Sequence, residues 1–140
     1  MTRENNKPIL CLDFDGVIHS YASGWKGIGI VSDPPVPGAM AFIRNAQEHL
    51  RVAIYSSRSS QPAGIKAMRD AVLKWLQEEF GKEEAGRIFA DIFWPISKPP
   101  AFLTIDDRAI TFNGLFQDPK DLLEFKPWNK LRLHENDTSK

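Results

Sequence analysis

A short apolar run that ends in two carboxylates constrains this chain more than any other feature. Residues 9–12 are continuously apolar, which is typical of a strand covered on both faces, and Asp13, Asp15 and Gly16 follow at once. Residues i and i+2 of a strand point to the same side, so the two carboxylates can converge while Phe14 turns to the core. Such like charges are costly beside a buried strand unless a cation or a substrate needs them. The stretch is therefore a candidate site, and the simpler alternative is a pair of acids that open a turn.

The totals are those of an ordinary globular domain. At 140 residues the chain has the length of one domain with one core. Eighteen basic and eighteen acidic residues give a formal net charge of zero, which offers no support for a polyanion-binding or membrane-surface protein. The single cysteine, Cys11, excludes an intrachain disulfide, and its apolar surroundings favour a buried thiol. No secretion signal or membrane-spanning run is present, so we expect a cytoplasmic protein without a membrane partner.

Apolar periodicity predicts strands that alternate with helices. The expected strands are residues 8–15, 51–56, 88–94, 101–105 and 109–112, and the expected helices are residues 39–50, 65–80 and 118–125, with a polar connection at 83–87. This alternation predicts right-handed βαβ units in an α/β fold, a three-layer Rossmann-like and mostly parallel sheet with helices on both faces. We expect one domain over residues 8–133, with flexible tails at 1–7 and 134–140.

Polar side chains follow the predicted strands at the points where they end. They are Asp13 and Asp15, Ser56 and Arg58, and Asp106 and Asp107, with Lys98 in the loop before the last of these strands. Ligands of such folds lie beyond the carboxyl ends of the strands, so we expect these groups to meet at one edge of the sheet.

Converging carboxylates are suited to a hard cation, and Mg²⁺ fits best. A carboxylate near the metal can attack phosphorus and form an aspartyl phosphate. A second acid can protonate the leaving oxygen and later activate water. A hydroxyl and an ammonium would hold the phosphoryl oxygens. The residue types therefore predict a Mg²⁺-dependent phosphomonoester hydrolase.

The same residues resemble the haloacid dehalogenase (HAD) superfamily in four short motifs. In chain order these are Asp13-Phe14-Asp15-Gly16-Val17, Ser56 at a strand end with Ser57 as the alternative, Lys98, and the pair Asp106-Asp107. The resemblance implies a HAD-like core in which Asp13 is the nucleophile and Asp15 the general acid/base. It also implies that Ser56 and Lys98 hold the phosphoryl group. The metal would be bound by Asp13, Asp15 through its carbonyl, and Asp106 or Asp107.

The second aspartate of the first motif favours a phosphatase over a dehalogenase, because an alkoxide leaves poorly unless it is protonated. Ser56-Ser57-Arg58 and Asp106-Asp107-Arg108 are also similar to the 3′-phosphatase domain of phage-type polynucleotide kinase-phosphatases. That similarity implies a phosphate contact for Arg58, and the alternative is an ion pair with a neighbouring acid. The chain has no G-x-x-x-x-G-K-[ST] loop, which excludes the kinase activity.

The segment 17–37 has room only for a flap in place of a cap domain, so we expect a capless site. Of the flap side chains, Trp25 is the favoured substrate contact, and His19 is a further candidate for a contact with the leaving group. Outside the flap, the expected substrate contacts are Gly16, Ser57 and Arg58. The expected partner is a phosphorylated small molecule or a nucleic-acid end, with a homo-oligomer left open. A phosphate- or nucleotide-binding module with little turnover is the alternative function.

Overall fold

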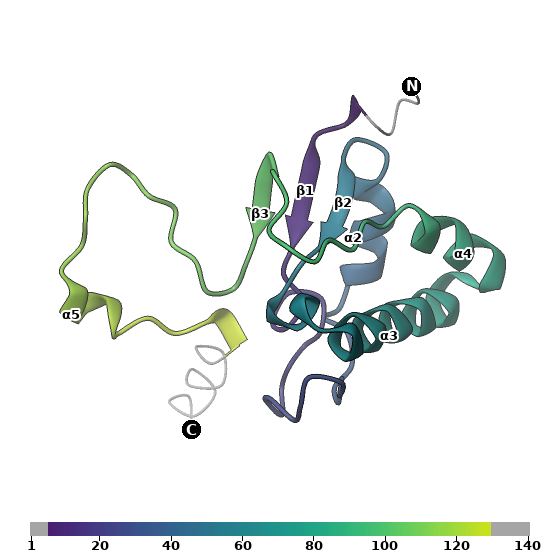
Figure 1. Ribbon diagram of the computed structural model, residues 1–140, viewed down its shortest axis with the longest axis horizontal. Helices are drawn as coiled ribbons and strands as arrows, with labels where there is room; N and C mark the ends of the chain where they lie inside the picture. The colour runs from purple at the N-terminus through teal and green to yellow at the C-terminus, as the bar shows by residue number, and fades with distance from the viewer. Residues whose placement is uncertain (1–5, 130–140) are drawn as a thin grey trace.

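Three parallel strands form an open sheet whose middle strand carries the first two carboxylates. The computed structural model describes residues 6–129, and in it β1 (Ile9–Leu12) lies between β2 (Arg51–Ile54) and β3 (Leu103–Ile105) (Figure 1). Leu10 is opposite Val52 on one side and Leu103 on the other. The carboxyl ends of all three strands therefore lie at the same edge, as the sequence predicts.

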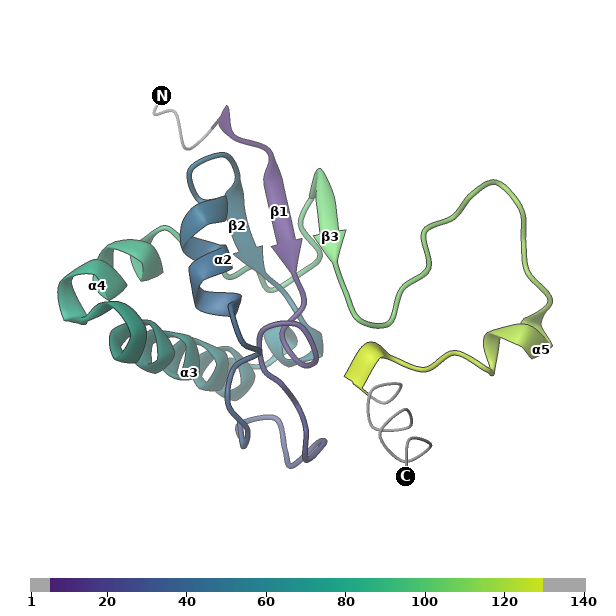
Figure 2. The same cartoon turned by 180° about the vertical axis from the view of Figure 1, so that it is seen from behind.

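Helices make the two crossovers. α2 (Ala39–Ala46) joins β1 to β2, and η1 (Ser57–Ser60), α3 (Pro62–Phe80) and α4 (Lys82–Ala90) join β2 to β3. In Figure 1, α2 lies behind the sheet and the chain that follows α4 crosses in front of it, whereas α3 and α4 lie on the β2 side. Figure 2 shows the same arrangement from behind. The α/β class is confirmed in this coarser form, with three strands among the described residues.

The core lies between the strands and the inner stripes of the helices. It includes Leu10, Leu12, Val52 and Ile54 from the strands, Met40 and Ile43 from α2, and Met68, Val72 and Leu76 from α3. These α3 positions recur at intervals of four residues, the spacing that keeps side chains on one face of a helix. Each fully buried large apolar side chain contributes about 1.5–3 kcal/mol, so this cluster fixes the sheet edge that carries the candidate site.

The predicted strand at residues 88–94 is wrong over most of its length, because α4 occupies residues 82–90. Gly81, at φ 84°, separates α3 from α4, and Ala85 and Ile88 are the buried face of the new helix. Only Phe93 keeps a strand role: its N–H donates to Val52 O at 2.9 Å, and its carbonyl accepts from Ile54 N at 2.9 Å. The predicted polar connection at 83–87 is therefore helical.

The chain after β3 departs most from the prediction. Residues 109–112 form no strand, and α5 (Pro119–Leu122) is shorter than the helix predicted at 118–125. In Figures 1 and 2 this segment runs out to one side of the sheet as a long loop and returns. We call residues 108–129 the C-terminal arm. A strand needs a neighbour for its backbone hydrogen bonds, and in the described part of the chain none lies beside residues 109–112.

The flap of residues 17–37 contains turns and isolated bridges, with no hairpin of regular strands. The tail predicted at 134–140 lies outside the described residues, as do the first five residues of the tail predicted at 1–7. Lys7 in that first tail is held, because its Nζ donates to Gln47 O at 2.8 Å. None of the helices in residues 6–129 is both long and apolar enough to cross a bilayer.

Candidate functional site

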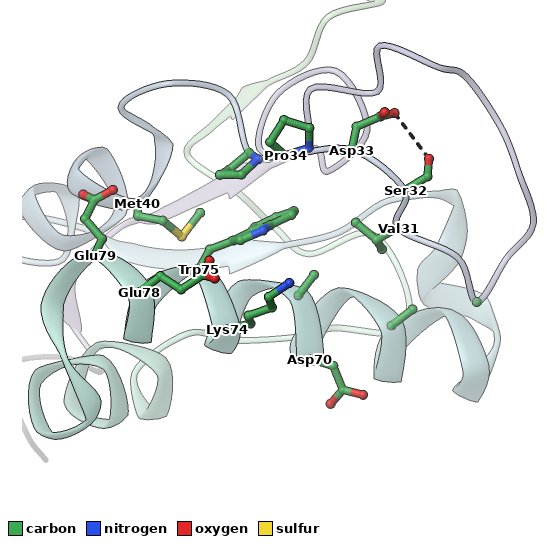
Figure 3. Close-up of a pocket in the computed structure, with 14 residues that line it drawn as sticks. Val31, Ser32, Asp33, Pro34, Met40, Asp70, Lys74, Trp75, Glu78 and Glu79 are labelled. Carbon is green, nitrogen blue, oxygen red and sulfur yellow. Dashed lines mark hydrogen bonds between the residues drawn. The ribbon is translucent and has the colours of Figure 1, made fainter.

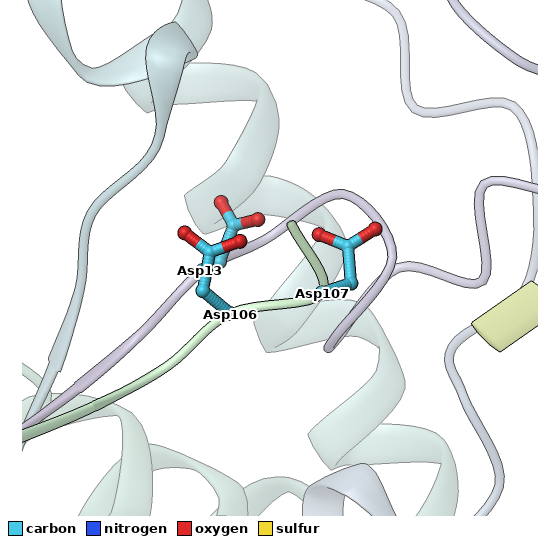
Figure 4. Close-up of side chains that lie close together, drawn as sticks. All are labelled: Asp13, Asp106 and Asp107. Atoms are coloured by element: carbon cyan, nitrogen blue, oxygen red, sulfur yellow. The ribbon is translucent and has the colours of Figure 1, made fainter. Parts of the chain in front are cut away.

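Three aspartates meet where the central strand and its neighbour end. Asp13 follows β1, and Asp106 and Asp107 follow β3, while the amide of Asp13 donates to Ile105 O at 3.0 Å and ties the two strand ends together. One carboxylate oxygen from each aspartate lies within 4.8 Å of the others (Figure 4). An all-oxygen group of this kind matches the ligand preference of Mg²⁺ and similar hard cations. The structure thus brings together the side chains of three of the four predicted metal ligands.

Crowding of negative charge perturbs these carboxyl groups. Burial, followed by the negative charge of Asp106, raises the pKa of Asp13 to about 8. Burial also raises the pKa of Asp107. Without a cation the cluster therefore retains a proton that an isolated aspartate would lose well below neutral pH. A bound divalent cation would favour the fully ionised form, which is the electrostatic reason to consider a metal here.

Gly16 lets one of these carboxylates approach the backbone. Its φ is 88°, in the left-handed region, and a Cβ at this position would overlap the carboxylate of Asp107. Its carbonyl accepts a hydrogen bond of 2.7 Å from the indole Nε1 of Trp128. The glycine of the first motif is thus needed for the shape of the site, and the end of the C-terminal arm is attached beside it.

Asp15 is not a member of the aspartate cluster, and its carboxylate contacts Arg58 and His19 instead. Arg58 donates from Nε to Oδ2 at 2.9 Å and from Nη2 to Oδ1 at 3.2 Å, and the Nδ1 of His19 lies 2.8 Å from Oδ1. Burial alone would raise the pKa of Asp15, but the hydrogen bonds from His19 and Arg58 outweigh it and hold that pKa below its usual value. In this conformation Asp15 is an ionised anchor.

Arg58 has the ion-pair role that was the alternative to phosphate binding. Its side chain is fully buried, and Nη1 donates to the carbonyls of Gly27 and Ile28 in the flap at 3.0 and 2.8 Å. Its guanidinium carbon lies 4.7 Å from the centre of the Trp25 ring, which is half exposed. The guanidinium of Arg58 is therefore not accessible for the predicted contact with a substrate. Trp25 remains accessible, and its predicted substrate contact stays a prediction.

His19 is also fully buried, so it is not open to a leaving group. Its Nε2 accepts a hydrogen bond of 3.1 Å from the backbone N–H of Asp33, which leaves Nδ1 as the nitrogen that donates to Asp15. Asp33 in turn accepts from the Ser23 amide and hydroxyl, and these bonds lower the pKa of Asp33. Flap, histidine and Asp15 thus form one connected network.

The two candidate serines differ in exposure. Ser56 is buried, its hydroxyl accepts from Arg58 N at 3.0 Å and lies 3.3 Å from the Met68 sulfur, and it caps η1. Ser57, the first residue of η1, is exposed. The more accessible hydroxyl therefore belongs to Ser57, the residue that sequence reasoning ranked second.

Lys98 lies in the loop before β3 and is exposed. Within residues 6–129 no ion pair joins it to Asp13, Asp106 or Asp107, so its predicted role toward a phosphoryl group stays a prediction. The positive charge of Lys98 lowers the pKa of the Cys11 thiol, and it is the smallest of several influences on that pKa. Burial raises the pKa of the Cys11 thiol, which fits the inert cysteine predicted from sequence.

A groove away from the aspartate cluster is the largest of those described here. It has a volume of about 810 Å³ and runs between residues 29–35 and α3, with Trp75 and Met40 in its apolar wall and acidic side chains at its rim (Figure 3). None of the three clustered aspartates lines it. A candidate active site is identified by its reactive side chains rather than by the volume of a groove, so we assign the candidate site to the aspartate cluster.

Sequence reasoning gave no role to Trp128 and did not foresee how His19 is used. Asp15 and His19 are four residues apart in a tight turn that contains Gly16, a spacing that could have indicated their contact. The contact of Trp128 with Gly16 joins residues 112 positions apart and has no local signal. Comparisons with protein-family models, with curated proteins and with solved structures find no match to this chain.

Proposed function

We propose that this protein is a Mg²⁺-dependent phosphomonoester hydrolase with a HAD-like, capless site, and that it works through an aspartyl phosphate on Asp13. The observation that supports the proposal most is the convergence of Asp13, from the central strand, with Asp106 and Asp107, from the neighbouring strand. Nucleophile and metal ligands of this chemistry must lie within a few ångströms of one phosphoryl group, and these two strand ends provide that proximity.

The side chains of Asp13, Asp106 and Asp107 would hold the metal. When bound, the cation would supply positive charge to the phosphoryl oxygens and reduce the repulsion between them and the aspartates. The raised pKa of Asp13 supports this assignment, because a carboxyl group that is costly to ionise alone gains most from a cation. We propose Mg²⁺ because it is typically bound by a small number of carboxylates together with the phosphate oxygens of a substrate.

The proposed reaction has two displacements at phosphorus. A carboxylate oxygen of Asp13 attacks, the bond to the leaving oxygen breaks, and that oxygen takes a proton from Asp15. Water then attacks the aspartyl phosphate and gives its proton to Asp15, and the bond between Asp13 and phosphorus breaks to release inorganic phosphate. Ser57 or Ser56 and Lys98 would hold the phosphoryl oxygens.

Asp15 can donate a proton only after its contacts change. Arg58 and His19 hold it as a carboxylate, and the same guanidinium binds the flap carbonyls. We therefore propose that the proton-donor state of Asp15 goes with a loosened flap, in which Trp25 meets the leaving group. Substrates with a nucleoside or a nucleic-acid 3′-phosphate are one class for this open site, and small phosphorylated metabolites are the other. We propose the cytoplasm as the compartment, since a reducing environment keeps Cys11 a free thiol.

The ionised state of Asp15 also favours a second candidate, a phosphate- or nucleotide-binding module with little turnover. An Asp15 that serves only to anchor Arg58 and the flap needs no proton-donor role. The two candidates differ in one respect that can be measured, because only the hydrolase releases phosphate.

Phosphate release from a substrate panel tests the proposal. The panel contains para-nitrophenyl phosphate, mononucleotides, a sugar phosphate and 3′-phosphorylated oligonucleotides, each with Mg²⁺ and with EDTA. Release that requires Mg²⁺ would support the hydrolase, and the best substrate would identify the leaving group. No release in spite of a Mg²⁺-dependent rise in melting temperature would favour the binding module. No release and no effect of any divalent cation would contradict both.

A further inference from the structure

One pocket of this protein lies along the outer edge of β2, apart from the aspartate cluster. It has a volume of about 380 Å³, which is within the range of sites for small organic molecules. Lys7, which precedes β1, and Arg51, which begins β2, place it near the amino ends of two strands. The clustered aspartates follow the carboxyl ends of the strands, and none of them lines it. The pocket is therefore separate from the candidate site.

Positive charge predominates in this pocket. Three cationic side chains line it, Lys7, Arg51 and Arg69, and the one acidic side chain that lines it is the exposed Asp91. Among residues 6–129, no ion pair includes any of these four. The whole chain has a formal net charge of zero, so the excess of two positive charges is a local property of the pocket. Such an excess favours a ligand with two negative charges.

The cationic groups retain N–H donors for a ligand. The guanidinium carbon of Arg51 lies 4.3 Å from the centre of the Phe93 ring, and that of Arg69 lies 5.7 Å from the centre of the Trp94 ring. A guanidinium that stacks on an aromatic ring keeps the N–H groups at its edge for anions, and its planar fork matches phosphate oxygens. The ammonium of Lys7 donates one hydrogen bond of 2.8 Å to a backbone carbonyl and has two further N–H groups.

Two buried polar atoms of residues that line the pocket have no hydrogen-bond partner within the described part of the chain. They are Nε1 of Trp94, which is a donor, and Oε1 of Gln47, which is an acceptor. The other end of the same amide is used, because Gln47 Nε2 donates to Ile88 O at 2.8 Å. Buried polar groups are paired in the great majority of cases. An unpaired donor and an unpaired acceptor at one pocket therefore indicate a ligand that has both an oxygen acceptor and a hydroxyl donor.

We propose that this pocket binds a small organic phosphate that carries a hydroxyl group. The phosphate lies between Lys7, Arg51 and Arg69, and its charge of about −1.5 to −2 near pH 7 matches the positive excess of the pocket. Solvent does not reach the Trp94 N–H in this structure, so that group donates to a phosphate oxygen once the long side chain of Arg69 moves off the ring. The ligand hydroxyl donates to Gln47 Oε1. The proposal does not depend on hydrolase activity.

The four tryptophans of the chain allow the binding site to be located by NMR. In proton–nitrogen spectra of the full chain in EDTA, glycerol phosphate should shift the indole signal of Trp94, which the variant Trp94→Phe assigns. Trp25 and Trp128 lie beside the candidate site and should keep their indole signals in place. Shifts of Trp25 or Trp128 while Trp94 stays in place would put the anion at the candidate site and overturn the proposal. No shift of any indole signal would overturn it as well.

Isothermal titration calorimetry in EDTA gives the affinities. The double variant Arg51→Gln, Arg69→Gln should lower the affinity for glycerol phosphate at least about tenfold, because it removes two charged donors. Arg87→Gln is the matched control, since Arg87 pairs with Glu84 outside the pocket, and Lys98→Gln is the control at the candidate site. Both controls should bind as the parent does. An affinity that the double variant keeps, or that Lys98→Gln loses, would overturn the proposal.

Two further checks complete the test. Methyl phosphate has the charge of glycerol phosphate without its hydroxyls, so it should bind about tenfold more weakly, and equal affinity would overturn the proposed hydroxyl contact. Circular dichroism shows whether the double variant is folded. If it is not, the indole shift of Trp94 in the parent protein decides the matter by itself.

Discussion

The guanidinium of Arg58 binds the carboxylate of Asp15 through two hydrogen bonds, of 2.9 and 3.2 Å, across 43 positions of sequence. The arginine side chain is fully buried and also holds two flap carbonyls. The turn that follows β1, the η1 segment that follows β2 and the flap are thus joined at one charged group. This pair is the structural link between the candidate site and its flap.

Arg58→Met should destabilise the protein strongly. The substitution leaves the partly buried Asp15 without its main cationic partner and frees the carbonyls of Gly27 and Ile28, so we expect a loss of about 3–5 kcal/mol in the free energy of unfolding. Urea unfolding measures it. The matched control is Arg87→Met, which removes an exposed arginine paired with Glu84 at 3.0 Å and should cost about 0–1 kcal/mol. Equal losses in the two variants would contradict the role given to Arg58.

The two serines at the end of β2 should separate stability from activity. Ser56→Ala removes the cap of η1 and should cost about 0.5–2 kcal/mol in stability, whereas Ser57→Ala, at an exposed position, should cost less than about 0.5 kcal/mol. If Ser57 holds the phosphoryl group, Ser57→Ala lowers turnover with little change in melting temperature. Turnover lost only in Ser56→Ala would return the role to Ser56. Thermal melts and phosphate release on the same preparations decide the matter.

Gly16→Ala should damage the aspartate cluster. Its positive φ strains any other residue, and the new methyl group would occupy the place of the Asp107 carboxylate. We expect a loss of about 1–3 kcal/mol in stability and a weaker effect of Mg²⁺ on the melting temperature. Gly86→Ala is the control: a Cβ there meets open space within α4, and the change should be neutral or stabilising by up to about 1 kcal/mol. A normal Mg²⁺ response in Gly16→Ala would contradict the geometry of the site.

Without divalent cations, stability should fall as the pH rises from about 4 to about 8. The folded-state pKa of Asp13 is raised to about 8 from its ordinary 3.8, so in this window the folded protein holds a proton that the unfolded chain has released. The free energy of unfolding therefore decreases with pH across the window and levels off above it. Asp13→Asn should flatten this dependence, and Mg²⁺ should oppose it by binding the ionised cluster. Urea unfolding in EDTA at several pH values gives the slope; a slope of opposite sign in the parent protein would contradict the assigned shift.

The three strands of the sheet and the carboxylates at the ends of β1 and β3 were predictable because their signals are local. An apolar run that stops at Asp13, and another that stops at Asp106, place both groups at one sheet edge as soon as the strands are parallel. The partner of Asp15 was not predictable with certainty, since the choice between a phosphate and a carboxylate for Arg58 depends on where a residue 43 positions away lies.

The errors have a common physical origin in ambiguous apolar runs. Ile88, Phe89, Ile92 and Phe93 fit the period of a strand or of a helix, and the packing of α4 against α3 decides in favour of a helix through residue 90. Residues 109–112 are rich in strand-forming side chains, but strand formation requires a partner that the sequence does not specify. Where the local sequence is compatible with both a helix and a strand, tertiary contacts thus determine which of the two forms.

Turnover by the parent protein and by Asp13→Asn, measured side by side with Mg²⁺ on the best substrate of the panel, tests the central claim most directly. The substitution keeps the size of the side chain and removes the nucleophilic carboxylate. We predict that phosphate release falls at least about 10³-fold, as expected when a nucleophile is lost, while circular dichroism and melting temperature show that the fold is kept. Phosphate release at the parental rate by a folded Asp13→Asn protein would contradict the account.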